Sequence, residues 1–79
     1  MNNPMVDYMN TARDLNKFLS GDSSEAVTVN EALSTVPSTR RLAIKTAAVE
    51  LLVRGTFGND GYGDAVRHAV ASYHAYGRK

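Results

Sequence analysis

The chain has 79 residues, a formal net charge of +1 and no cysteine. A chain of this length buries only about 60% of the surface that it exposes when unfolded, so one domain, 1–79, with a narrow stability margin is predicted. The absence of cysteine excludes disulfides, thiolate zinc sites and thiol nucleophiles, which leaves self-association as the remaining way to reinforce a small core.

The first helix is predicted over residues 4–20. Asn3 suits the capping position, Pro4 suits the first helical position, and Gly21 suits the exit. Apolar residues recur at every third or fourth position, which places them on one helix face. This inward stripe contains Met5, Met9, Ala12, Leu15 and Leu19. Its two methionines would suit an adaptable interface as well as a core.

A second, shorter helix is predicted over residues 28–36, after a polar connector. Thr28 and Glu31 have the spacing of a capping box, and Val27 and Ala32 have the spacing of a hydrophobic staple. Proline disfavours helical backbone in the residue before it, so Pro37 marks the end of this helix. Its inward residues are Val29, Ala32, Leu33 and Val36.

The third helix is predicted over residues 38–54, with Gly55 as its left-handed C-terminal cap. Its apolar residues cover most of the circumference, which is typical of a helix buried on more than one side. We therefore expect helix 3 to be central. Its two apolar arcs contain Ile44, Ala47, Ala48 and Leu51, and Leu42, Val49, Leu52 and Val53.

The fourth helix is predicted over residues 64–76, capped by Asp64, after a connection (55–63) that holds four glycines. Val66, Ala69, Val70 and Tyr73 form its inward stripe. Apart from a stub at 26–29, no stretch alternates with the period of a strand. The sequence thus predicts an all-α, compact bundle of about four helices.

No catalytic, cofactor-binding or metal-ligating residue is predicted. Asp64, His68 and Ser72 are the residue types of a triad, but one helix face cannot supply triad geometry and an oxyanion hole. His68 and His74 point about 120° apart, unlike the i, i+4 histidines of helical zinc sites. The glycine-rich loop lacks the Lys-Ser/Thr of a phosphate-binding loop. We expect no enzyme activity and no cofactor.

Two adjacent arginines, Arg40 and Arg41, stand at the predicted start of helix 3, and Lys45 follows one turn later. The helix dipole disfavours cations there by about 0.3–1 kcal/mol each. An external phosphate or carboxylate, held also by the Ser38 and Thr39 hydroxyls, would offset this cost.

An internal anion is the alternative. Residues 1–37 carry two positive and five negative charges, whereas residues 38–79 carry seven positive and three negative charges. Asp7, Asp14 or Glu31 could therefore pair with the arginines and hold the two halves together. An acidic patch on another protein, or on a second copy of this chain, would serve equally well.

The loop and the carboxy-terminal end supply a second set of candidate contacts. Aromatic residues are favoured anchors at protein interfaces, and two of them lie in the glycine-rich loop. The candidate partner-binding residues of this set are Phe57, Asn59, Asp60, Tyr62 and Tyr76.

These features favour a small non-enzymatic regulatory or inhibitory protein, of the phage or bacterial accessory type, that binds another protein. Two alternatives stay open: a DNA-binding protein with a degenerate helix-turn-helix (28–54), and a structural homo-oligomer such as a homodimer. The longest apolar run, 46–53, contains Glu50 and is far shorter than the ~20 residues of a membrane span, and residues 1–17 do not resemble a secretion signal. We expect a cytoplasmic protein with no membrane partner.

Overall fold

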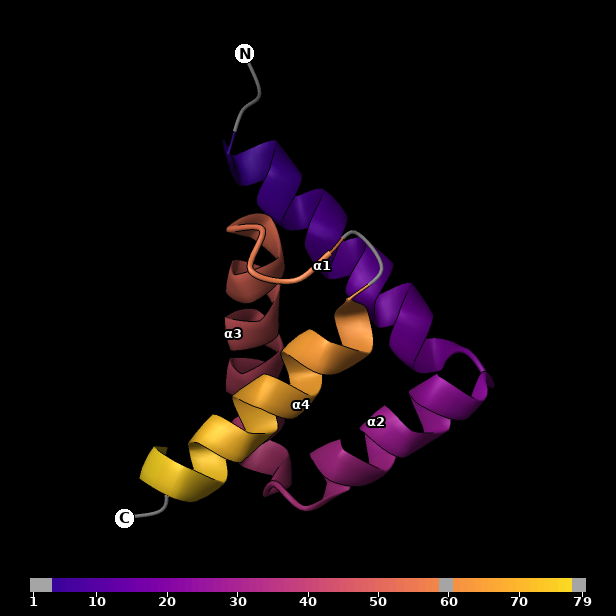
Figure 1. The fold of residues 1–79 in the computed structure, drawn as a ribbon, viewed down its shortest axis with the longest axis vertical. Coiled ribbons are helices and arrows are strands. Elements are labelled where there is room, and N and C mark those ends of the chain that lie inside the picture. The colour runs from indigo at the N-terminus through magenta and orange to yellow at the C-terminus, as the bar shows by residue number, and fades with distance from the viewer. Residues whose placement is uncertain (1–3, 59–60, 78–79) are drawn as a thin grey trace.

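A computed structural model describes residues 4–58 and 61–77, with side chains from residue 7 onward. The described residues form helices joined by turns and contain no strand, which confirms the all-α bundle (Figure 1). A 3₁₀ turn, η1, precedes α3 and a π-helical turn, η2, follows α4. The elements are α1 (Pro4–Ser20), α2 (Ser24–Ser34), η1 (Ser38–Arg40), α3 (Arg41–Val53), α4 (Tyr62–Ser72) and η2 (Tyr73–Gly77).

Helix α3 packs against both α1 and α4, as predicted for the central helix. Helix α4 shares the inner position, because it also packs against α2 (Figure 1). All four helices contribute to one core, and no polar side chain of the described residues is buried in it. The core contains Leu15, Val29, Leu33, Val36, Ile44, Ala48, Val49, Ala65, Val66, Ala69 and Val70. No helix in the described ranges has the length and apolar character needed to cross a bilayer.

The inward stripe of α1 is narrower than predicted. Leu15 is 1% exposed, but Met9 is 63% exposed. At about 100° per residue, Met9 lies about 120° from Leu15 around the helix, beyond the arc that α3 and α2 cover. The prediction for Met9 is therefore wrong.

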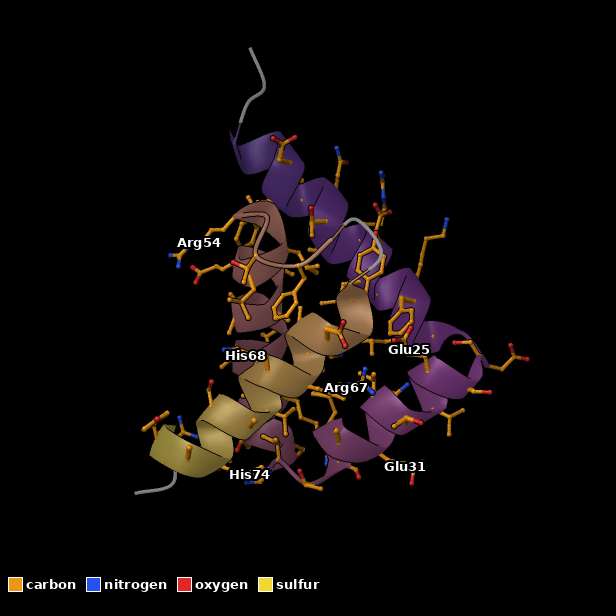
Figure 2. All side chains as sticks on the ribbon, in the orientation of Figure 1. Glu25, Glu31, Arg54, Arg67, His68 and His74 are labelled. Carbon is orange, nitrogen blue, oxygen red and sulfur yellow. The ribbon has the colours of Figure 1, made fainter. Side chains whose placement is uncertain are left out.

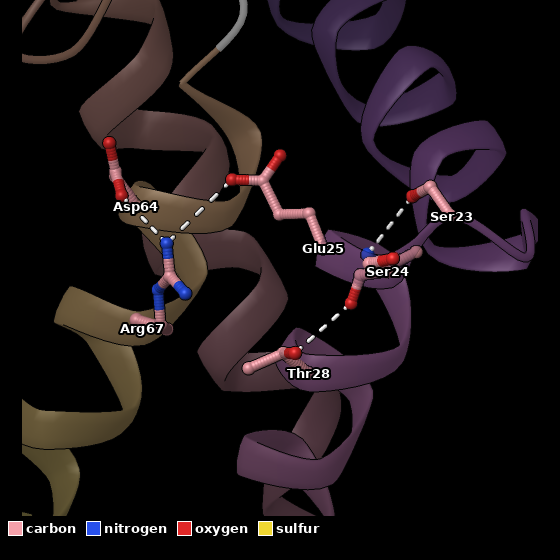
Figure 3. Close-up of polar contacts among 7 residues, drawn as sticks. Ser23, Ser24, Glu25, Thr28, Asp64 and Arg67 are labelled. Carbon is pink, nitrogen blue, oxygen red and sulfur yellow. Dashed lines mark hydrogen bonds and ion pairs between the residues drawn. The ribbon is translucent and has the colours of Figure 1, made fainter.

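Helix α2 begins four residues earlier than predicted. The Ser23 hydroxyl accepts a hydrogen bond from the Ala26 backbone N–H at 3.1 Å and so caps the helix (Figure 3). Thr28 is no cap, since its hydroxyl donates to the Ser24 carbonyl at 3.0 Å inside the helix. The expected staple is also wrong, because Val27 is 51% exposed.

Helix α3 differs from its prediction at the start and agrees at the end. The first turn is the separate 3₁₀ turn η1, and Leu42 is 76% exposed although its apolar arc predicts burial. At the other end, Gly55 has φ +77° and donates its N–H to the Leu52 carbonyl, while Thr56 donates to the Leu51 carbonyl, both at 3.1 Å. This is the Schellman motif that a glycine at this position predicts.

Helix α4 begins at Tyr62, with Gly61 rather than Asp64 in the capping position. Asp64 instead lies in the first turn, where its Oδ1 accepts a hydrogen bond from Arg67 Nη2 at 2.9 Å (Figure 3). The same Arg67 nitrogen is 3.7 Å from Glu25 Oε2 on α2. The Glu25 carboxylate thus lies over the start of α4, where the helix dipole favours negative charge.

Candidate functional site

Arg41 is half-buried and is held by backbone carbonyl groups of its own chain. Its Nε donates to the Val36 carbonyl at 3.0 Å, and its Nη2 lies 3.5 Å from the Ser34 carbonyl. These carbonyls end α2, and a cation at a helix C-terminus interacts favourably with the dipole. One of the two arginines therefore has an internal partner, but that partner is backbone carbonyl oxygen and not the carboxylate of Asp7, Asp14 or Glu31. Glu31 lies at the outer edge of the molecule, on α2 (Figure 2).

The remaining residues of the predicted basic patch are more accessible. Ser38, Thr39 and Arg40 are exposed in η1, and Lys45 is half-buried one turn into α3. Among the described residues, the cation that forms ion pairs is Arg67. Arg40 and Lys45 therefore keep their charge available to an external anion.

The aromatic loop does not join this patch. Tyr62 stacks on Phe18 of α1 with ring centroids 5.7 Å apart, and Phe57 lies 6.0 Å from the His68 ring. Both aromatic residues are half-buried, so they help to fasten the loop to the bundle. Phe57 follows α3 whereas Arg40 precedes it, and a helix of that length separates them by about 20 Å. Asn59 and Asp60 lie outside the described residues.

The carboxy-terminal turn lies near the start of α3 instead. His74 Nε2 is 2.8 Å from the Thr35 hydroxyl, which ties η2 to the connection after α2. Tyr76, one of the candidate partner-binding residues, is 81% exposed. It is thus available for contacts at this end of the molecule.

Of the residues with catalytic types, His68 and Ser72 line one recess beside Glu50, whereas Asp64 does not line it. Asp64 is engaged by Arg67, and the His68 ring lies beside Phe57. Figure 2 shows His68 and His74 at different levels of the α4–η2 segment. Within residues 4–58 and 61–77, no three His, Asp or Glu side chains are grouped so as to hold a metal ion.

The segment 28–54 does not have the packing of a helix-turn-helix. The two helices of that motif pack on each other, whereas α2 and α3 both pack on α4 and make little contact with one another. The exposed side chains of α3 are Leu42, Ala43, Thr46, Glu50 and Val53, and Lys45 is half-buried beside them.

Two adjoining hollows lie on α1 and between α1 and α3. The first is a broad, open depression of about 680 Å³ along α1, and the second is a smaller recess of about 90 Å³ between the two helices. Both are lined by Ala12 and Asn16, so they form one continuous surface. The depression is also lined by Met9, Arg13, Lys17 and Ser20. The recess is also lined by Tyr8, Leu42, Lys45 and Thr46.

We call these ten residues the α1–α3 surface. Its apolar members, Met9 and Leu42, are two of the most exposed large hydrophobic side chains described. Three cations line the same two hollows: Arg13 and Lys17 lie with Met9 in the depression, and Lys45 lies with Leu42 in the recess. Arg13 donates to the neutral Asn10 side chain at 3.2 Å, and none of the three forms an ion pair with another described residue.

Sequence reasoning identified one member of this surface, Lys45, as a binding residue. Met9 and Leu42 stand in apolar stripes, which predict core positions, although the two methionines of the α1 stripe also suit an adaptable interface. Met9 and Leu42 differ from core residues in their angular distance around the helix from Leu15 and Ile44. Whether that distance leaves a side chain exposed depends on how the helices pack. Comparison of the chain with protein-family models, with curated proteins and with solved structures gives no match.

Proposed function

We propose that this chain is a small non-enzymatic regulatory or inhibitory protein that acts by binding another protein through the α1–α3 surface. The observation that carries the proposal is the exposure of Met9 and Leu42 beside two connected hollows. A single exposed leucine is ordinary on a protein surface, but exposed apolar side chains grouped around a hollow mark interaction sites.

The polar rim of the same surface supports the proposal. Protein interfaces combine an apolar centre with a polar border, and here Arg13, Lys17 and Lys45 border Met9 and Leu42. The small side chains of Ala12 and Ser20 leave room between the longer ones. The surface can therefore receive a protruding side chain and hold it by charge contacts at the edge.

A capture experiment with matched variants tests the proposal. Leu42→Asp places a charge at the apolar centre, and the dipole tolerates an aspartate in the first turn of α3. We expect Leu42→Asp to lose the proteins that the tagged wild-type chain captures from a lysate of its source cells. The bound proteins are measured by quantitative mass spectrometry.

Val27→Asp is the matched control. Val27 is also an exposed apolar residue near a helix start, but it lies on α2, outside the α1–α3 surface. This control should capture the same proteins as wild type. If Leu42→Asp retains the partners, or if both variants lose them equally, the α1–α3 surface is not the binding site.

A further inference from the structure

We infer that the occupant of the α1–α3 surface is an acidic amphipathic helix of another protein; this inference rests on the function proposed above. The depression follows one face of α1 from Met9 to Ser20, a length of about 17 Å at 1.5 Å per residue. A docked helix of about three turns has the same length, and helices pack on one another through side chains at helical spacing.

The positive charges of the α1–α3 surface favour a partner helix that carries negative charge. Arg13 and Lys17 line one hollow, and Lys45 lines the other, so cations lie on both helices that frame the site. Among the described residues, none that lines either hollow is acidic. Glutamate or aspartate beside the apolar residues of the partner would face these cations, and complementary charge favours and orients such encounters.

A second copy of the chain fits this surface less well. In a two-fold symmetric dimer the same patch faces itself, so Arg13, Lys17 and Lys45 would face the same three cations. Like charges across an interface oppose association. The apolar centre likewise favours a protein helix over nucleic acid, whose interfaces are polar and strongly charged.

The test uses designed peptides and the full chain. One helical peptide of about 16 residues carries leucines at helical spacing flanked by glutamates, and two matched peptides carry glutamine or lysine in place of every glutamate. We expect the glutamate peptide to bind most tightly, with affinity that falls as salt is added. Its binding should shift the NMR amide signals of Ala12, Asn16, Leu42 and Thr46.

Charge-reversed variants locate the contact. Lys17→Glu with Lys45→Glu should weaken the glutamate peptide about tenfold, equivalent to about 1.4 kcal/mol. Arg54→Glu combined with Val27→Asp and Thr56→Asp changes the net charge equally but at exposed residues outside the two hollows, so it should have little effect. Equal losses in both variants would overturn the inference.

The remaining outcomes distinguish the acidic-helix inference from the proposed function on which it rests. Equal affinity for the glutamine or lysine peptide at the same residues would overturn the acidic preference and leave the proposed function intact. The acidic-helix inference would be overturned if the glutamate peptide caused no shifts at these residues. It would also be overturned if duplex DNA, anionic vesicles or an increased protein concentration caused larger shifts there. The capture experiment then decides the proposed function by itself.

Discussion

Leu15→Ala is expected to lower the free energy of unfolding by about 3 kcal/mol, because it removes a nearly inaccessible side chain that α1 contributes to the shared core. A domain of this size has a total stability of about 4–12 kcal/mol, so the loss is a large fraction of it. The transition temperature should fall by roughly 15 °C. Chemical denaturation followed by far-ultraviolet circular dichroism measures the change.

Leu42→Ala is the control for this experiment. It makes the same chemical change in a helix, but at a side chain that is 76% exposed. We expect a change within about 0.5 kcal/mol, as is usual for surface substitutions. Comparable costs at the two positions would contradict the packing of α1 described above.

Gly63→Val is expected to cost about 1 kcal/mol, because Gly63 is buried where α2 crosses the start of α4 and the side chain that must move aside is the exposed Glu25. A Cβ atom at this position would lie 2.8 Å from Glu25 Oε2, 3.0 Å from its Cδ and 3.1 Å from its Cγ. The larger valine side chain would have to displace Glu25 and disturb its contact with Arg67.

A double-mutant cycle checks the cause. Glu25→Ala removes the three atoms that a side chain at position 63 would meet, so Gly63→Val should cost clearly less in that background. Glu25→Ala itself should cost less than about 1 kcal/mol, since the ion pair with Arg67 is exposed. If the costs of Gly63→Val and Glu25→Ala are additive, the Glu25 side chain does not limit the space at position 63.

The predicted helices agree best with the structure where one local rule determines the helix boundary or the buried face. Gly55 predicts the end of α3 because a left-handed residue there closes the Schellman motif. The stripe of α4 is mostly confirmed, since Val66, Ala69 and Val70 are buried. Helix starts were less predictable, because Ser23 and Thr28 are both suitable caps and only the observed hydrogen bond distinguishes them.

The candidate site depends on tertiary packing, which periodicity does not contain. Arg41 was expected to meet an anion, but its partners are the carbonyls that end α2, which come within reach only after the turn at 35–40 is formed. Leu42 has the residue type of a core position, yet 76% of it is exposed. The α1–α3 surface therefore arises from where α1 crosses α3, and no spacing along the chain identifies it.

Site-directed photocrosslinking inside the source cells tests the central claim most directly. A photoreactive amino acid replaces Leu42 in one version of the chain and Val27 in another, so that one probe lies on the α1–α3 surface and the other on α2. We predict a discrete protein adduct from position 42 that position 27 does not give. Equal adducts from both positions, or adducts from position 27 alone, would contradict the assignment of protein binding to the α1–α3 surface.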